Sequence, residues 1–495
     1  MSLSSWLPLF TGGFPNHGAD RSRPRRLPAP RRRGPRPGLE RLEDRTLPSS
    51  YTAASVSDLV ADINAANQGG GANTITLAAG TTFTLKRVDN TTDGATGLPV
   101  IAAGDQLTLL GNGDTVQRSG ASATPAFRLF DVASGASLTL ENLTLQNGLA
   151  FGSGTAARGG ALYNQGSLLL SGVTVQDNIA HGADGVNGTN SYPYAGTPGQ
   201  SAWGGGIYSN GSLTLENGSQ LVSNQVLGGN GGNAYRSRGP GGSGGDGLGG
   251  GLFVAAGKVN LTNTTVGSNQ AHGGVAGAAG TGVTFGGTGA GAGIYFSSGT
   301  LMGTSVTVVN NDAVTGGGTG GAQSGGGIAI ADGTVTLSDV LVQGNVGGPA
   351  GGLYIVGGTV TLSNSSVQDN YGGVYIAGGV VTLSSDTIES NRSSGGIVIV
   401  GGTVTLSDDT VQSNSTFGNG GGILITGGTV TLCGDTVQSN TSNLYGSANG
   451  GGIYIRQGTV YIDPFTVAHT TNNTDISGQN SSTDNINGSY ILRNC

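Results

Sequence analysis

The sequence is short of charge, of aromatic side chains and of cysteine. Only 10% of its 495 residues are charged, 5% are aromatic, and the two cysteines are Cys433 and Cys495. Two cysteines supply neither a metal-ligand spacing nor a disulfide framework. No apolar run approaches the roughly 20 residues of a membrane-spanning helix, so we expect no transmembrane span. Metal-cluster, disulfide-rich and membrane-spanning classes are therefore disfavoured.

The basic residues are unevenly distributed. Residues 1–50 hold 10 of the 21 basic residues and 8 of the 15 prolines, whereas the remainder holds 11 basic and 24 acidic residues. An acidic, lysine-poor body argues against nucleic-acid binding, because proteins that bind nucleic acid concentrate basic residues on one face. Glycine is abundant, with 98 residues. High glycine with low charge can indicate disorder, but the strand periodicity of the body argues for order.

The first 50 residues are rich in arginine and proline. Eight arginines fall between Arg21 and Arg36 and are interrupted by prolines, so we predict a disordered sorting segment over residues 1–50. The stretch LERLEDRTLP, from Leu39 to Pro48, resembles the arginine-rich Leu-Glu-x-Arg segment of many large exported bacterial proteins. That resemblance implies export to the cell surface or the medium. A plain disordered tail and a tail that binds nucleic acid or an anionic surface are the alternatives.

A repeated unit organises the body. Gly401 to Asn414 reads GGTVTLSDDTVQSN, and close copies begin at Gly357, Gly378 and Gly427, so the unit recurs every 21 to 26 residues. Looser copies begin at Gln165, Asn210, Ala256, Ser298 and Asp332. Because strand side chains alternate, Val404 and Leu406 lie on one face and the threonines between them on the other.

Each unit contains three short strands and three turns. A strand such as GGGILI precedes TVTLS, and DTVQSN supplies the third strand. One unit has too little apolar surface for a core of its own, whereas stacked units bury their Val, Leu and Ile columns together. The sequence therefore predicts an all-β fold, a right-handed parallel β-helix solenoid of roughly 10–13 rungs with three strands each.

One asparagine closes each unit. We predict that these residues form a structural ladder, because stacked amides bond along a column and because asparagine tolerates the left-handed conformation of a sharp corner. A line of asparagines that grips a ligand is the alternative. The predicted ladder residues are Asn178, Asn224, Asn269, Asn345, Asn370, Asn391, Asn414 and Asn440.

The ends of the body depart from the repeat. Residues 55–67, SVSDLVADINAAN, carry apolar residues at helical spacing, and Ser55 and Asp58 have capping-box spacing. We predict an N-terminal capping helix that covers the first open rung. The resulting organisation is a linker and capping helix over 51–67, the β-helix over 68–463, and an irregular C-terminal cap over 464–495.

The entry region resembles a known family. The stretches NTITLAAG and SLTLENLTLQNG, followed by the glycine–TVTL–asparagine units, are similar to pectin-lyase-like right-handed β-helix proteins of the polymorphic outer-membrane-protein type. The resemblance covers roughly residues 51–480. It implies a secreted or surface-attached, often adhesin-like protein. The resemblance implies this fold but does not imply a particular activity.

Long glycine-rich insertions follow the ladder asparagines in the N-terminal half, at 179–203, 225–248, 270–290 and 312–324. Insertions at one corner of a rung emerge on one edge of a solenoid, so we predict a loop fringe there. Aromatic and arginine side chains in the fringe are candidate binding residues. Alternatively, these side chains pack against the solenoid and hold flexible loops in place. These candidates are Tyr192, Tyr194, Trp203, Tyr235, Arg236 and Arg238.

Signals for chemistry are weak, and we assign no catalytic residue. The acid pair Asp408–Asp409 is replaced in sibling units, which favours a turn over an active site. His181 and His272 open two insertions and could approach each other, but no acid or thiol accompanies them. GGSGGDGLG fits one calcium-binding nonapeptide, which needs tandem copies, so calcium at Asp246 is a weak alternative to no cofactor and no metal.

We therefore expect a non-enzymatic exported or cell-surface protein, adhesin-like or structural, that presents its loop fringe to an extracellular polysaccharide or surface protein. A polysaccharide lyase or glycoside hydrolase is the alternative. Ice binding through the outward Thr-x-Thr array, such as Thr403 and Thr405, is a minor alternative, because threonine also simply suits an exposed strand face.

Overall fold

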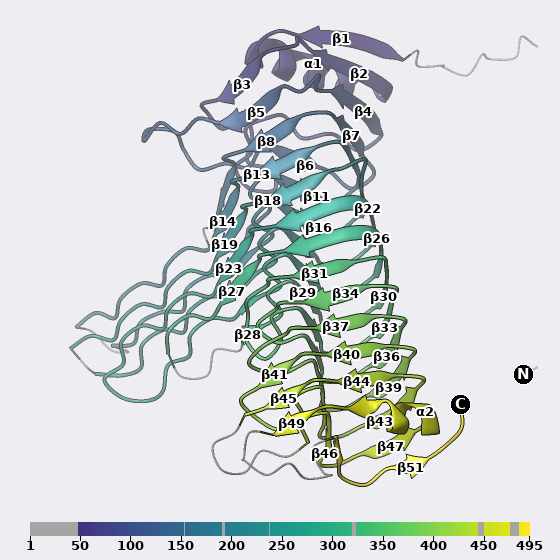
Figure 1. The fold of residues 1–495 in the computed structure, drawn as a ribbon. Coiled ribbons are helices and arrows are strands. Elements are labelled where there is room, and N and C mark those ends of the chain that lie inside the picture. Colours follow the sequence, from purple (N-terminus) through teal and green to yellow (C-terminus); the bar gives the residue numbers. More distant parts are fainter. Residues whose placement is uncertain are drawn as a thin grey trace, which may run out of the picture. The chain divides into compact units, whose positions relative to one another are not determined.

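The chain forms a right-handed parallel β-helix, as predicted (Figure 1). The computed structural model describes residues 48–152, 154–190, 194–236, 238–318, 323–443, 450–475 and 485–495. The named strands within this part pair in parallel, each with the same segment of the next rung. No helix of the described residues is long and apolar enough to cross a membrane.

In the described structure, the first strands of the rungs form a sheet of 12 strands, and the second-strand column has 15 because three further strands precede it at the N-terminal end. Its end residues, such as Ile423 and Ile425, point into the core, and the middle residue faces outward. The strands are β6 (Phe130–Val132), β11 (Leu162–Asn164), β16 (Ile207–Ser209), β21 (Leu252–Val254), β25 (Ile294–Phe296), β29 (Ile328–Ile330), β32 (Leu353–Ile355), β35 (Val374–Ile376), β38 (Ile397–Ile399), β42 (Ile423–Ile425), β46 (Ile453–Ile455) and β50 (Ile486–Asn487).

The second strand of each rung is the TVTLS segment. Val404 and Leu406 are buried and stack in register on Val430 and Leu432. The strands are β1 (Ser49–Ala53), β2 (Gly71–Leu77), β4 (Asp105–Leu110), β7 (Ser137–Glu141), β12 (Ser167–Ser171), β17 (Ser212–Glu216), β22 (Lys258–Gly267), β26 (Thr300–Val309), β30 (Thr334–Ser338), β33 (Thr359–Ser363), β36 (Val380–Ser384), β39 (Thr403–Ser407), β43 (Thr429–Cys433), β47 (Thr459–Ile462) and β51 (Ile491–Leu492).

The third strand is the TVQ segment, whose middle residue is buried. In two rungs, β22 and β26 run through the corner and supply both segments. The separate strands are β3 (Thr82–Leu85), β5 (Thr115–Arg118), β8 (Thr144–Gln146), β13 (Thr174–Gln176), β18 (Gln220–Val222), β31 (Leu341–Gln343), β34 (Ser366–Gln368), β37 (Thr387–Glu389), β40 (Thr410–Gln412), β44 (Thr436–Gln438) and β48 (Thr470–Thr471).

Short side sheets continue the rungs beyond the ladder asparagines. One contains β9 (Leu149–Phe151), β14 (Ile179–His181), β19 (Gln225–Leu227), β23 (Gln270–His272) and β27 (Asp312–Val314). A second contains β10 (Ala157–Arg158), β15 (Ala202–Trp203), β20 (Gly247–Leu248), β24 (Gly289–Ala290) and β28 (Gln323–Ser324). A third contains β41 (Ser415–Thr416), β45 (Thr441–Ser442) and β49 (Thr474–Asp475).

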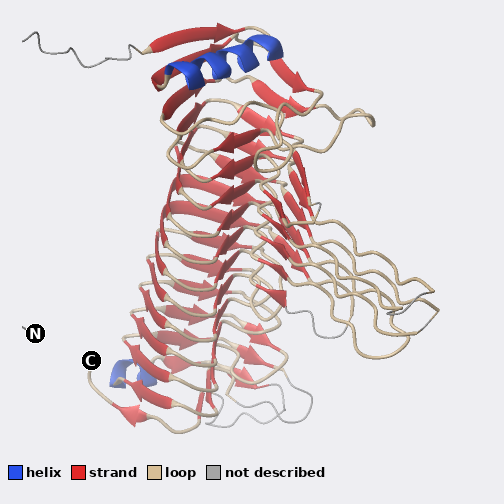
Figure 2. Ribbon diagram, turned by 180° about the vertical axis from the view of Figure 1, so that it is seen from behind, coloured by secondary structure: helices blue, strands red, loops and turns tan. Residues whose placement is uncertain are grey.

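The N-terminal helix lies across the end of the solenoid (Figure 2). Helix α1 spans Val56–Gly69, and the Ser55 hydroxyl accepts the Asp58 N–H at 3.2 Å, which confirms the predicted N-cap. Its side chains Leu59, Ile63 and Ala66 are fully buried. Before the helix, where the sequence suggested only a linker, β1 pairs with β2 and adds a strand to the stack.

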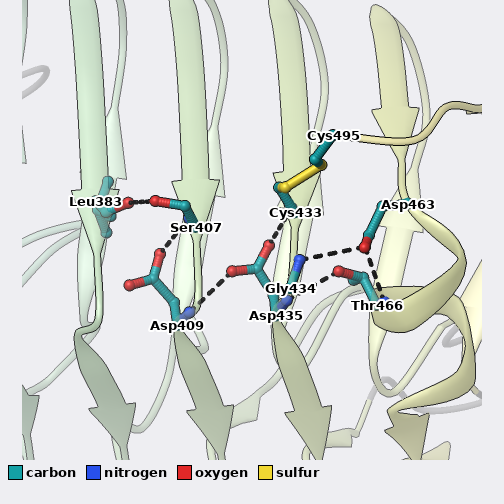
Figure 3. Close-up of a disulfide and its surroundings, with 9 residues drawn as sticks. All are labelled: Leu383, Ser407, Asp409, Cys433, Gly434, Asp435, Asp463, Thr466 and Cys495. Atoms are coloured by element: carbon teal, nitrogen blue, oxygen red, sulfur yellow. Dashed lines mark hydrogen bonds between the residues drawn. A yellow bond between two sulfur atoms is a disulfide. The ribbon is translucent and has the colours of Figure 1, made fainter.

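The C-terminal region retains more of the rung than the expected irregular cap. Helix α2 (Pro464–Ala468) and β48 follow β47, and Asn473 occupies the position of a ladder asparagine. The last strand, β51, pairs with β47, and a disulfide joins Cys495 to Cys433 on β43 (Figure 3). Two cysteines alone did not predict this bond, because their pairing depends on the strand stacking that brings their Cα atoms to 6.1 Å.

The asparagine ladder is confirmed and is longer than predicted. Asn391 shows the repeating pattern: its N–H and its side-chain amide both donate to the Asn414 oxygen at 3.0 Å, and the amide also donates to the Val367 carbonyl at 2.8 Å. Asn311 and Asn473 make the same contacts and were missing from the predicted set.

The predicted role of these asparagines in the left-handed corner is wrong. The residue before each ladder asparagine has the positive φ instead, as in Ser390 at 56° and Ser413 at 54°. The asparagine itself points inward, where its buried amide satisfies backbone groups that the corner would otherwise leave unpaired. At each corner, the first of these two residues thus adopts the left-handed turn, and the asparagine after it makes the hydrogen bonds.

Replacing Asn391 with alanine should destabilise the solenoid by about 3–5 kcal/mol, because buried backbone groups lose their partners. Chemical unfolding followed by circular dichroism measures the change. Thr403→Ala, on the exposed strand face of the next rung, is the matched control and should cost less than about 0.5 kcal/mol. Equal losses in both variants would contradict a structural role for the ladder.

Candidate functional site

In their described parts, the insertions form ordered layers rather than loose loops (Figures 1 and 2). In the first insertion, the N–H groups of Gly182, Gly185 and Gly188 donate to backbone carbonyls of the second insertion at 2.7–2.8 Å. The acceptors are, in order, Leu227, Asn230 and Asn233. A hydrogen bond every third residue is the repeat of a polyproline-II helix. We call this assembly the glycine slab, and its described residues are 182–190, 194–201, 228–236, 238–246, 273–288 and 315–318.

Bonds also connect the outward and return legs of the slab. Thr197 and Gln200 donate to the carbonyls of Val186 and Ala183 within the first insertion, at 2.9 and 2.8 Å. Gly229 of the second insertion donates to the Gln200 carbonyl at 2.8 Å, and this pattern recurs in the third insertion. Each leg is therefore held by backbone bonds on more than one side.

Glycine at every third position makes this packing geometrically feasible. A Cβ on Gly229 would collide with the Ala183 carbonyl, and one on Gly274 would collide with the Gly229 carbonyl. Close backbone approach at a crowded axis is where only glycine fits. The glycine content of the insertions is thus a packing requirement.

Gly274→Ala should open the slab and leave the solenoid folded, because the methyl group would displace a backbone carbonyl. We expect amide hydrogen exchange in residues 228–246 and 273–288 to accelerate at least tenfold, with solenoid exchange unchanged. Gly120, which has open space at its Cβ position, provides the control Gly120→Ala. Unchanged slab exchange in Gly274→Ala would contradict the close packing.

Four of the predicted binding residues meet where the slab legs turn back. Tyr235 donates its N–H to the Tyr194 carbonyl at 2.9 Å, and Arg238 donates to the Tyr235 carbonyl at 2.8 Å. The Arg236 guanidinium lies 5.4 Å from the centre of the Tyr235 ring, and both arginines are exposed. We call Tyr194, Tyr235, Arg236 and Arg238 the slab tip. Tyr192 lies outside the described residues.

Trp203 lies instead at the base of the slab. On β15, its ring stacks on Phe253 at 5.6 Å and on Tyr208 at 6.4 Å between centroids. The Arg158 guanidinium lies 5.1 Å from the Trp203 ring. These side chains pack the return legs against the outer face of the 12-stranded sheet. The structure therefore separates Trp203 from the slab tip.

Beneath this base lies a buried ion pair that the sequence analysis missed. Arg128 approaches the fully buried Asp131 to 3.8 Å, and neither Asp131 oxygen has a hydrogen-bond partner in the described structure. Burial raises the pKa of Asp131 to about 6 despite the arginine. Only the rung stacking brings Arg158 of the following rung close to this pair. Because Asp131 is enclosed, it is not placed to contact a substrate.

The acid pair of the central repeat has two structural roles. Asp408 occupies a corner with φ 58°, which confirms the turn interpretation. Asp409 is buried, and its carboxylate accepts the N–H groups of Asp386 at 2.7 Å and Ser407 at 3.2 Å. Asp435 bonds the Asp409 N–H at 2.9 Å in the same way, and Thr466 closes this second ladder (Figure 3).

Burial perturbs the acids of this second ladder. Desolvation raises the pKa of Asp386 to about 6, of Asp409 to about 8 and of Asp435 to about 7, although backbone N–H groups oppose the shift. A raised folded-state pKa means that the protonated acid is favoured by folding. Their contribution to stability is therefore greatest below the unfolded pKa and is lost as the pH rises through these values.

We expect the free energy of unfolding to fall as the pH rises from about 4 to about 8. Asp409→Ser should reduce this fall in the free energy of unfolding by about 1–3 kcal/mol, because a serine hydroxyl does not ionise between pH 4 and 8. Serine fits the position, since Ser365 occupies the same column and accepts a backbone N–H there. Asp408→Ser is the matched control, since Ser385 occupies the equivalent corner. A pH profile that Asp409→Ser leaves unchanged would count against ionisation in this ladder.

The structure separates the two histidines and shows which groups Asp246 bonds. His181 and His272 lie in the same column, but Leu227 of β19 stands between them in the register. The Asp246 carboxylate accepts the Thr288 N–H at 2.7 Å, and its own N–H donates to the Ser201 hydroxyl at 3.0 Å. Asp246 thus links successive layers of the slab.

The Thr-x-Thr array is in register but interrupted. Thr403 stacks between Val380 and Thr429, and Thr431 stacks on Tyr461. Near its C-terminal end, one group of potential metal ligands occurs among the described residues: Cys433, Asp463 and Cys495 lie within 4.8 Å of one another. The two sulfur atoms are bonded to each other (Figure 3), so they are not available as thiolate ligands.

Comparison with known proteins adds no functional assignment. A scan against protein-family models finds no match for this sequence, and a search of the curated proteins finds none. The arguments for function that follow rest on the residues and their geometry.

Proposed function

We propose that this chain is a non-enzymatic, exported or cell-surface β-helix protein, adhesin-like or structural, that presents the glycine slab to an extracellular polysaccharide or surface protein. The observation that carries the proposal is the bonding within the slab. The legs are joined by backbone hydrogen bonds at every third residue, so the slab tip is displayed on a scaffold that loses little entropy on binding.

The chemistry of the slab tip supports a binding role. Arginine and tyrosine are enriched among the residues that dominate binding energies. Arg236 and Arg238 place two exposed positive charges on a body that is otherwise acidic. Such a local reversal of charge favours encounter with an anionic partner.

Three features support export. The disulfide between Cys433 and Cys495 is a bond that persists in oxidising compartments. The Leu-Glu-x-Arg segment and the similarity of the entry region to pectin-lyase-like proteins of the polymorphic outer-membrane-protein type point in the same direction.

A lyase or hydrolase of the same fold is less well supported. Cleavage of a polysaccharide needs carboxyl groups that reach the substrate. In the described structure, the acids with pKa values raised to about 6–8 are Asp131, Asp386, Asp409 and Asp435, and all four are buried. Their perturbation reflects internal packing, not an accessible acid–base pair.

The double variant Arg236→Ser/Arg238→Ser tests the proposal. We expect binding of the purified full chain to whole cells and to extracted envelope polysaccharide to fall at least tenfold, because the charged contacts at the slab tip are removed. Lys86→Ser/Arg87→Ser, two substitutions beside the capping helix, is the charge-matched control.

Two results would contradict the proposed function. One is cell and polysaccharide binding that is unchanged in the slab-tip variant. The other is release of sugar products from acidic or neutral polysaccharides, with or without calcium, that is lost when an exposed acid is replaced.

A further inference from the structure

Three side chains with metal-binding atoms come together near the C-terminal end of the solenoid. The sulfur atoms of Cys433 and Cys495 and a carboxylate oxygen of Asp463 lie within 4.8 Å of one another. Among the described residues, no other group of acidic, histidine or cysteine side chains is gathered so closely. We call these three residues the cysteine–aspartate site (Figure 3).

The stacking of the last rungs assembles this site. β43 pairs with β47 so that Leu432 lies beside Ile462, and the next residues along the two segments are Cys433 and Asp463. β51 pairs with β47 in turn, and the residues after it lead Cys495 back to Cys433. Three segments that are distant in sequence therefore each contribute one ligand atom.

The Asp463 carboxylate is held in place by backbone donors. Its Oδ1 accepts the N–H of Gly434 at 3.2 Å and the N–H of Thr466 at 2.9 Å (Figure 3). A carboxylate has about four lone-pair positions, so these two bonds leave acceptor capacity for a cation. Carboxylates that bind metals are commonly oriented by hydrogen bonds of this kind.

The two cysteines also exist as thiols. A disulfide forms by oxidation of two thiols, so the dithiol state precedes the bond between Cys433 and Cys495. Cys495 is exposed and Cys433 is half-buried, which lets a reductant reach the bond in the folded chain. Reduction by a dithiol or a phosphine supplies two electrons, breaks the S–S bond and, with two protons from water, leaves two thiols.

We propose that in the dithiol state Cys433, Cys495 and Asp463 bind one Zn²⁺ ion, with water as the fourth ligand. Binding forms two sulfur–zinc bonds and one oxygen–zinc bond and releases the two thiol protons. In a tetrahedral site with sulfur–zinc bonds of about 2.3 Å, the two sulfurs lie roughly 3.8 Å apart. Cysteines whose Cα atoms are 6.1 Å apart reach this separation by side-chain rotation. Thiolate ligands favour zinc over magnesium and calcium.

The local charge suits a divalent cation. Two thiolates and one carboxylate carry three negative charges, and Zn²⁺ together with one guanidinium carries three positive charges. That guanidinium is Arg493, which lines a cavity of about 320 Å³ with both cysteines and lies 5.1 Å from the centre of the Tyr461 ring. A neighbouring arginine also favours the thiolate over the thiol.

The disulfide and the zinc ion are two ways of anchoring the same segment. Each links Cys495 to β43 and thereby keeps β51 on β47, one under oxidising and the other under reducing conditions. β51 needs such an anchor because its two residues, Ile491 and Leu492, are 53% and 60% exposed and bury little apolar surface. The inference shares no residue with the slab tip and does not rest on the proposed function.

Titration of the phosphine-reduced full chain with Co²⁺ under argon tests the inference, because tetrahedral cobalt bound to thiolates absorbs visible light. We expect the absorption to saturate at one ion per chain and to disappear when Zn²⁺ displaces Co²⁺. The disulfide form should show no such absorption. Zn²⁺ should also slow amide hydrogen exchange at least tenfold in residues 485–495 of the reduced chain and leave exchange in the oxidised chain unchanged.

Three variants separate the ligands from the fold. Cys433→Ser should abolish the cobalt absorption, and it introduces the residue that the preceding rung carries at Ser407. Asp463→Asn should weaken binding at least tenfold and retain the N-cap of α2, because asparagine caps helices as well as aspartate does. Asp332→Asn, at an exposed acid outside the site, is the matched control and should bind Co²⁺ as the parent chain does.

The inference is overturned if the reduced chain gives no tetrahedral cobalt absorption at millimolar Co²⁺, or if Cys433→Ser or Cys495→Ser retains it. Equal binding by the reduced and oxidised chains would also overturn it. Hydrogen exchange in residues 485–495 that does not respond to Zn²⁺ would overturn the anchoring role. Unfolding curves that match the parent chain show that a loss of binding does not arise from misfolding.

Discussion

The structure depends on satisfying backbone groups at the corners of a stack of short strands. Each strand is only a few residues long, so every rung buries corner N–H and carbonyl groups that the sheets do not pair. The asparagine column bonds these groups from rung to rung, as Asn391 does with Asn414 and Val367. Apolar columns can then pack in register because the polar groups between them are already paired.

Buried backbone groups are paired by other residues in two further parts of the structure. In the second ladder, Asp409 and Asp435 perform the bonding with carboxylates, which makes their protonation part of the stability of the rung. In the glycine slab, backbone groups bond to one another directly, since Gly229 and Gly274 allow carbonyls to approach without a side chain. The slab and the solenoid are thus two ways of stacking the same rungs.

Function is proposed where the repeat changes. The insertions extend the rungs into the slab, and the last rungs bring Cys433, Asp463 and Cys495 together. Cys433 was visible in the sequence as a cysteine where the neighbouring unit carries Ser407. Its proximity to Asp463 was not visible, because it depends on the stacking of β43 on β47.

The sequence by itself determined the strand pattern, the right-handed β-helix, the capping helix and most of the asparagine ladder, because these follow from local periodicity repeated many times. Tertiary structure decided which neighbours each corner residue meets. In the structure, Ser413 has the left-handed conformation in place of the ladder asparagine that follows it, and Cys433 is bonded to Cys495. Trp203 lies at the slab base rather than at the slab tip. Those outcomes depend on contacts between rungs, which are distant in sequence and close only after stacking.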